Sequence, residues 1–297
     1  MKFDNYKFRC HYQGDIVSTP KPLTSKQLET LEAYRSKDKL TDKQKADLIS
    51  LEYKEIESKK YTLSTTAQKL LNKIVYNEKY KRNTTLKNKY FTKGLECEKK
   101  SRDILSRLFG EILTYDTETK SNDWVTGTRD IKHDEYIIDI KTSYNIDSFY
   151  LHLVENQSDY YLRQLDSYMD LWGLNKSLLC YVLVDTPFNL IDDEIRRLDY
   201  KDNILTMYGD VRDDKIGDVV ELVSNHIYTG DGLDLFCSKS TMVKKEWFTD
   251  FVEIPEKDRV HIVTHKYDKA RIEQRNNCLA LAREYMNNVK TINNIIW

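Results

Sequence analysis

The sequence predicts an α/β protein in which a mixed central sheet is flanked by helices and preceded by a helical N-terminal region. Two patterns support this prediction. In the N-terminal part, apolar residues recur at helical spacing, as in Leu70, Leu71, Ile74 and Val75. Between residues 93 and 185 the pattern changes to helix, three strands, helix and strand, which is typical of an α/β core.

The first 110 residues are predicted to be mainly helical. Residues 1–23 form an irregular or short β entry, and Thr24 then opens a helical region that reaches about residue 56. Ser64 or Thr65 caps a second helix. A third begins near Lys93 and ends at Gly110. Its inward side chains are expected to be Leu95, Ile104, Leu105 and Leu108.

The segment from residue 111 to 185 should contribute the core strands. Short runs rich in β-branched and aromatic residues, separated by polar turns, predict three strands, then a helix and a strongly apolar strand. In order, these are Glu111–Tyr115, Asp123–Gly127, Tyr136–Lys141, Tyr160–Gly173 and Ser177–Asp185.

Beyond Pro187 the pattern predicts acidic, less regular segments, a strand pair, a strand at Val260–Thr264 and a closing helix over Asp268–Val289. There is no internal repeat and no low-complexity linker. We therefore expect a helical region at 1–85 and a second part at 86–297, joined as one continuous domain.

Several classes of protein are disfavoured. No apolar run approaches the roughly 18 residues of a membrane span, and charges interrupt the N-terminus, so neither a membrane protein nor a signal peptide is predicted. The five cysteines are scattered, without a CxxC pair, which indicates reduced thiols in the cytoplasm and no zinc or iron–sulfur site.

Charge is unevenly distributed although the formal net charge is only −1. From Lys69 to Arg102 there are eleven Lys or Arg and three Glu, a local net charge of about +8. This stretch is expected either to line a phosphate-binding surface or to be a solvated helix face. If it binds DNA, the expected contacts are Lys87, Lys89, Lys93 and, from a later loop, Arg129.

The candidate catalytic residues begin with Asp139 and Lys141. A strand sends alternate side chains to one face, so these two project together while Ile138 and Ile140 face the other side. A carboxylate and an amine in an apolar strand are costly unless they are used or paired. The pattern D/E-x-K occurs eight times in the chain, but this copy alone lies in an Ile-rich strand preceded by a strand that ends in a carboxylate.

That second carboxylate is Asp130, which follows Gly127 and is expected to meet Asp139 across neighbouring strands. Two close carboxylates repel each other unless a cation lies between them, and an all-oxygen site favours Mg²⁺ or Mn²⁺. The alternative for Asp130 is a turn residue whose carboxylate bonds the backbone of its own loop.

These residues, in this order, resemble the PD-(D/E)XK nucleases, and further motifs resemble the lambda-exonuclease and RecB-like branch. Gly94 is followed four residues later by Glu98, with Glu96 as the second choice for the helix carboxylate. Gln164 and Tyr168 match a Q-x-x-x-Y helix that precedes an apolar strand. The resemblance covers roughly residues 60–190. Asp139 stands where Glu is commoner, and Arg129 replaces the usual Pro.

The resemblance implies a restriction-endonuclease-like core and a metal-dependent deoxyribonuclease. Asp130, Asp139 and the Ile140 carbonyl would hold Mg²⁺, with Glu98 binding directly or through water. Lys141 would orient the attacking water, and Gln164 would fix Lys141 or the nucleotide end. Tyr168 would belong to the same site or be a core aromatic residue.

The implied activity is hydrolysis of one strand of duplex DNA from an end, leaving a 5′-phosphate, in phage recombination. A single-strand-annealing protein and a homo-oligomer are the expected partners. Two other functions remain open: a site- or structure-specific endonuclease with the same core, and a catalytically idle fold that binds DNA.

Overall fold

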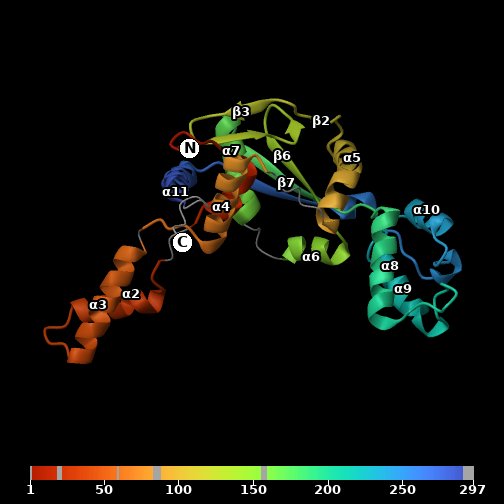
Figure 1. Ribbon diagram of the computed structural model, residues 1–297, viewed down its shortest axis with the longest axis horizontal. Coiled ribbons are helices and arrows are strands. Elements are labelled where there is room, and N and C mark those ends of the chain that lie inside the picture. The colour runs from red at the N-terminus through yellow and green to blue at the C-terminus, as the bar shows by residue number, and fades with distance from the viewer. Residues whose placement is uncertain (1, 19–21, 59, 83–87, 155–158, 290–297) are drawn as a thin grey trace.

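Helices and strands are intermixed along the chain in the computed structural model of the protein (Figure 1). The structure describes residues 2–18, 22–58, 60–82, 88–154 and 159–289. The α/β class predicted from the sequence is confirmed, and the strands fall into three small sheets.

The sheet that carries the candidate residues has the order β6–β7–β8. Its strands are β6 (Ile137–Thr142), β7 (Lys176–Val182) and β8 (Val260–Lys266). β6 and β7 are parallel, with Lys141 opposite Tyr181, and β8 is antiparallel to β7. The sheet is therefore mixed, and β6 forms one of its edges.

The other strands form two smaller sheets. The first has the order β1–β4–β3, and in the second β2 pairs with β5. Their bounds are Phe8–Arg9 (β1), Thr114–Tyr115 (β2), Thr119–Ser121 (β3), Val125–Thr128 (β4) and Ile131–Lys132 (β5). Gly127 lies where β4 passes closest to its neighbours. A Cβ there would stand 2.7 Å from Cys10 Sγ and 2.8 Å from Tyr168 Cε1, so only glycine fits.

Helix α5 (Lys89–Phe109) covers one face of the main sheet. It starts four residues earlier than predicted, capped by the Asn88 side chain, and ends as predicted at Gly110, which has a φ of 71°. Ile104 and Leu105 are buried against the sheet. The prediction for Leu95 and Leu108 is wrong, because both are exposed (58% and 45%).

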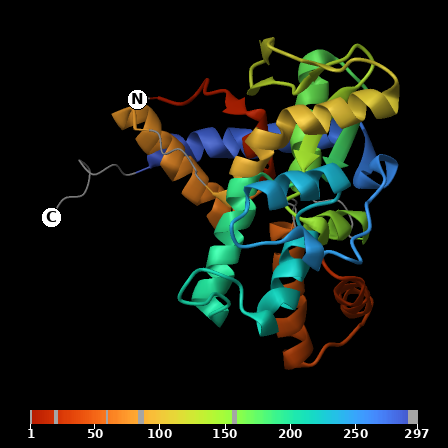
Figure 2. The same cartoon turned by 90° about the vertical axis from the view of Figure 1, so that its right-hand side faces the viewer.

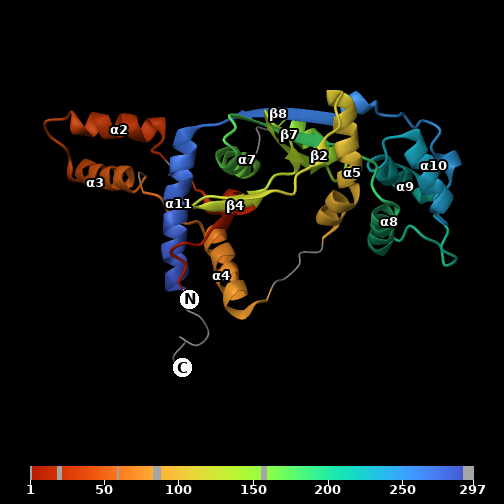
Figure 3. The ribbon, with the colours of Figure 1, turned by 90° about the horizontal axis from the view of Figure 1, so that it is seen from above.

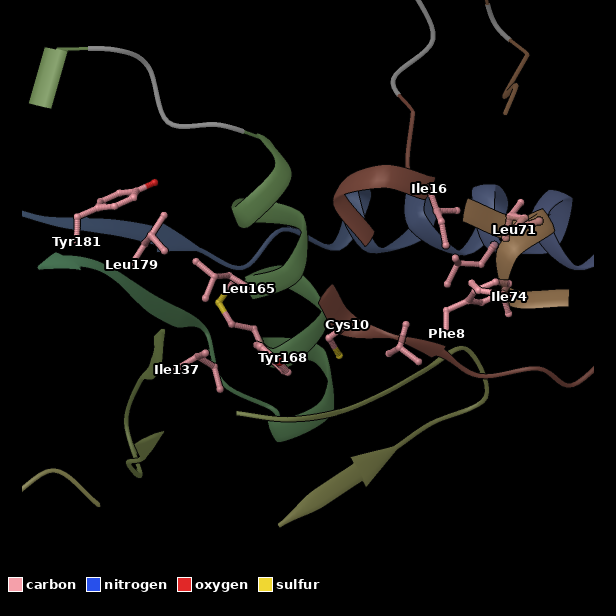
Figure 4. Close-up of a cluster of buried hydrophobic side chains, with 14 of the residues drawn as sticks. Phe8, Cys10, Ile16, Leu71, Ile74, Ile137, Leu165, Tyr168, Leu179 and Tyr181 are labelled. Carbon is pink, nitrogen blue, oxygen red and sulfur yellow. The ribbon is translucent and has the colours of Figure 1, made fainter. Parts of the chain in front are cut away.

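Helix α7 (Asp159–Trp172) covers the opposite face, where the main hydrophobic core lies. The core continues from α7 to α11 (Lys269–Asn288), α4 (Thr65–Tyr80) and α1 (Gln13–Ile16). Figure 4 shows Leu165 and Tyr168 of α7 between strand residues on one side and N-terminal residues on the other. The N-terminal segment thus shares a core with the strands.

Helices α2 (Ser25–Arg35) and α3 (Asp42–Glu57) form a hairpin that projects from the body (Figures 1 and 3). Thr24 and Thr41 each complete a capping box with a glutamine three residues later, as predicted for the first. The hairpin's own small core contains Leu23, Leu31 and Leu51.

Residues 188–239 are mainly helical, which corrects the prediction of irregular segments and a strand pair, while the predicted strand at Val260–Thr264 and the closing helix are present as β8 and α11. Residues 188–239 contain α8 (Phe188–Asp202), α9 (Ile216–Ser224) and α10 (Gly230–Lys239). These helices surround a second hydrophobic core, and Figure 2 shows them beside α5. The remaining helix is α6 (Ile146–Val154), with short 3-10 helices at Cys10–Tyr12, Asp213–Lys215, Lys245–Trp247 and Glu256–Arg259.

None of the helices in the described ranges is both long enough and apolar enough to cross a lipid bilayer.

Candidate functional site

Asp139 and Lys141 form an ion pair on the face of β6 that is turned toward α7. Lys141 Nζ lies 2.7 Å from Asp139 Oδ2, and the Asp139 side chain is almost fully buried. Ile138 packs on the opposite face, against α5 residues. The two-residue alternation of the strand therefore brings a carboxylate and an amine together, as predicted.

Asp130 lies directly before β5 and reaches the edge of β6. Its Oδ2 accepts a hydrogen bond of 3.2 Å from the backbone N–H of Ile140. Burial, followed by the negative charge of Asp139, raises the pKa of Asp130 to about 7, although Lys141 opposes the shift. The same two carboxylates act on Lys141. Burial alone would lower its pKa, but the charges of Asp139 and Asp130 outweigh burial and raise it.

The oxygens at this edge fit a divalent cation. Asp139 Oδ2 is buried and makes no well-oriented hydrogen bond within the described ranges, and the Lys141 amine lies 2.7 Å from it. The Ile140 N–H points to Asp130, and the carbonyl of a strand residue lies on the same side as its N–H. Among the described residues, however, no group of three or more His, Cys, Asp or Glu is close enough to hold a metal ion. The donor set is thus two carboxylates and a main-chain oxygen.

A pocket of about 630 Å³ opens at this edge of the sheet. Glu98, Asp130, Ile140 and Lys141 line it. Glu96 instead lines another cavity, between α5 and α10. Of the two helix carboxylates considered from the sequence, Glu98 is therefore the one that shares a pocket with Asp130 and Lys141.

Part of the pocket wall is aromatic, which the sequence reasoning missed. Tyr90, Phe91, Tyr144, Tyr161 and Tyr181 line it. Lys141 Nζ is 4.9 Å from the centroid of the Tyr161 ring, close enough for a cation–π contact. Two signals pointed to this wall. Tyr161 precedes Gln164 by three residues on the same helix, and Tyr181 is the direct cross-strand neighbour of Lys141.

Gln164 approaches the site from α7. Its Nε2 lies 3.3 Å from Asp139 Oδ1 and 3.4 Å from the Tyr168 hydroxyl, and both side chains are buried. In the structure Gln164 contacts Asp139, the ion-pair partner of Lys141, and its contact with a nucleotide stays a prediction. Tyr168 belongs to the hydrophobic core, and burial raises the pKa of its hydroxyl. Gln164 thus contacts Asp139 directly, and the Tyr168 hydroxyl contacts Gln164.

Arg129 does not face a DNA groove, and its prediction as a DNA contact is wrong. Its side chain is buried, Nε lies 2.6 Å from Asp116 Oδ2, and Nη1 donates to the His133 carbonyl at 2.6 Å. Burial alone would raise the pKa of Asp116, but the hydrogen bond and charge of Arg129, together with backbone N–H groups of the loop, lower it. Because the Asp116 N–H bonds the Asp130 carbonyl, this ion pair fixes the loop that presents Asp130.

Lys93 was also predicted to contact DNA, and this is wrong as well. The side chain is fully buried, and Nζ donates a 2.7 Å hydrogen bond to the Tyr144 carbonyl. Lys89 is only partly exposed and pairs with Glu194 at 2.9 Å, so its DNA contact stays a prediction. Lys87 lies outside the described residues.

The buried Lys93 amine predicts a pH-dependent stability. Burial lowers its pKa from 10.5 to about 7. Between those values the unfolded chain takes up a proton that the folded chain does not, so stability falls as pH decreases from 10.5 to 7. Lys93→Met should remove this dependence of stability on pH. The expected change in the free energy of unfolding between the two pH values is on the order of a few kcal/mol, at 1.36 kcal/mol per pKa unit.

Urea denaturation at pH 7 and pH 9.5 measures the effect, with the exposed Lys99→Met on the same helix as the matched control. An unchanged difference between the two pH values in Lys93→Met would show that this amine is protonated in the fold.

Comparison with protein-family models finds no match, and comparison with curated proteins finds none either. Among solved structures, the chain is similar to a phage-related exonuclease from Haemophilus somnus 129PT. The TM-score is 0.57 at 20% identity, over 95% of this chain and 94% of that one. An alkaline exonuclease from Laribacter hongkongensis covers 76% of this chain and 82% of its own, at 11% identity and a TM-score of 0.46. The first similarity shows that the chain shares the fold of a phage-related exonuclease.

Proposed function

We propose that this chain is a divalent-metal-dependent deoxyribonuclease of the PD-(D/E)XK superfamily, acting as an exonuclease on the ends of duplex DNA. The observation that carries the proposal is that Asp130 and Lys141 line one open pocket, while the buried Asp139 pairs with Lys141. The fold shared with a phage-related exonuclease supports it. The restriction-endonuclease-like core, assigned to residues 86–297, and a role in phage recombination belong to the same proposal.

Asp130, Asp139 and the Ile140 carbonyl would hold Mg²⁺ or Mn²⁺, with Glu98 facing the same space from α5. Such an ion, when bound, lowers the pKa of a water and offsets phosphate charge. The side chains of the protein would hold charged groups in fixed positions around the site. Lys141 stays protonated between two carboxylates, so it can donate hydrogen bonds to the water or to a phosphate oxygen. Gln164 keeps the Asp139 carboxylate oriented.

Digestion of labelled duplexes tests the proposal. Linear duplex labelled at the 5′ or the 3′ end should be degraded to 5′-phosphate products in Mg²⁺ and left intact in EDTA. A covalently closed circle of the same sequence should stay intact, because it offers no end. Cleavage of the circle would replace the exonuclease with an endonuclease, and stable substrates in both forms would overturn the nuclease assignment.

A further inference from the structure

Helix α4 carries a stripe of four residues that the candidate active site does not use. Its buried side is formed by Ala67, Leu71, Ile74 and Val75. At 100° per residue, Lys69, Lys73, Tyr76 and Tyr80 fall within about 60° of one another on the opposite side of the helix. We call these four residues the α4 stripe.

The stripe is basic and aromatic, without an acidic residue. Both lysines are exposed, and neither forms an ion pair with an acid in the described part of the chain. The rings of Tyr76 and Tyr80 stack, with centroids 5.8 Å apart and planes 22° from parallel. The single acid of α4, Glu78, lies toward the buried side and pairs with Lys81 at 3.1 Å.

This combination matches the chemistry of a single nucleic-acid strand. Lysines bind phosphates whatever the sequence, and exposed aromatic rings stack on bases that are not paired. A duplex offers its phosphates to the lysines but keeps its base faces stacked inside, so the tyrosines would gain nothing from it. Tyr80 is 39% exposed. Lys79 Nζ lies 5.4 Å from its ring centroid, and a base that stacks on the ring would displace this flexible side chain.

The stripe is also close to the pocket along the chain. α4 ends at Tyr80, and Tyr90 in the first turn of α5 lines the pocket. Ten residues of fully extended chain span at most roughly 35 Å, so the end of the stripe and the pocket rim lie within that distance. Figure 3 shows α4 and α5 as consecutive helices on either side of the intervening segment.

We propose that the α4 stripe binds single-stranded DNA, through its phosphates at Lys69 and Lys73 and its bases at Tyr76 and Tyr80. The inference rests on the proposed nuclease function, since the strand would be the one that is left unpaired when its complement is degraded. It assigns a product-strand surface outside the pocket.

Fluorescence anisotropy in EDTA tests the proposal without hydrolysis. The probes are a labelled oligo(dT) and a blunt duplex of equal length. Tyr76→Leu/Tyr80→Leu should weaken oligo(dT) binding about tenfold or more, while duplex affinity stays within roughly twofold. Lys69→Gln/Lys73→Gln should lower the slope of log affinity against log salt on oligo(dT) by about 1.4. Tyr53→Leu/Lys54→Gln on α3, where Tyr53 is 64% exposed, is the control and should bind like the unmodified chain.

If loss of the half-buried Tyr76 disturbs α4, Tyr80→Leu alone still tests the proposal. Circular dichroism shows whether the helix is intact in each variant. Unchanged oligo(dT) binding in Tyr80→Leu and the tyrosine pair, or equal losses on both probes, would overturn the proposal. So would an unmodified chain that binds no oligo(dT). If the unmodified chain degrades linear duplex while the stripe variants bind normally, this inference alone fails. If it binds oligo(dT) through the stripe but degrades nothing, only the nuclease assignment fails.

Discussion

Replacing Asp139 by asparagine is expected to lower metal-dependent hydrolysis of DNA by about a thousandfold or more, since the change would remove a proposed metal ligand worth several kcal/mol of transition-state stabilisation. Asparagine has nearly the same shape but only one oxygen and no charge. It therefore cannot replace a carboxylate that faces Lys141 through one oxygen and Gln164 through the other. Initial rates on linear duplex, measured over a range of Mg²⁺ concentrations, give the size of the loss.

Two further measurements separate a lost metal site from a lost fold. Mg²⁺ should raise the melting temperature of the unmodified chain but not of Asp139→Asn, because only the former gains a ligand that binds the folded state. Asp134→Asn, at an exposed position five residues earlier, should leave both activity and the Mg²⁺ effect unchanged. Activity in Asp139→Asn close to that of the unmodified chain would remove this residue from the site.

Lys141→Met is expected to lower kcat by about a hundred- to a thousandfold, comparable to removal of one transition-state hydrogen-bond donor. The affinity for DNA should change much less than kcat, because the hydrogen bond that the amine would donate in the pocket counts chiefly in the transition state. Single-turnover hydrolysis, together with DNA binding in Ca²⁺, distinguishes a loss in the chemical step from a loss in binding.

The same variant should alter the dependence of stability on pH in EDTA. The folded pKa of Asp130, about 7, is above its ordinary 3.8, so ionisation of this group costs stability as pH rises between those values. Without the positive charge of Lys141 the pKa should rise further, and the loss of stability should extend above pH 7. Melting temperatures at pH 5 and pH 9 check this, with the exposed Lys132→Met as control.

A Lys141→Met variant with normal kcat would show that Lys141 acts only as a counter-ion.

Local chemistry made part of the fold predictable. Thr24 caps the start of α2 with its side chain, and Gly110 ends α5 with a positive φ. Both helix ends lie where the sequence predicts them. The helices after Pro187 were missed because their signals are weak. α8 starts at a proline that provides no side-chain cap, and no acid lies in its first turn. α10 starts with Gly-Asp-Gly, although Thr229 does cap it.

In the candidate site, the period of the strand was enough to place Asp139 beside Lys141. Contacts between distant segments were not predictable in this way. Lys93 and Arg129 look like surface cations in the sequence, but their partners are the Tyr144 carbonyl, 51 residues away, and Asp116, 13 residues away. A basic residue close to an active site in sequence can therefore serve the scaffold alone.

The hydrogen bond from Ile140 to Asp130 has a consequence for the solubility of the protein. β6 is an edge strand, and unpaired backbone groups along such an edge invite a strand from another molecule to add to the sheet. An open pocket requires this edge to remain uncovered by a further strand. The Asp130 side chain accepts a hydrogen bond from the Ile140 N–H, so this backbone group is not available to a strand from another molecule. One side chain is therefore expected to disfavour strand addition at this edge while it leaves room for a ligand.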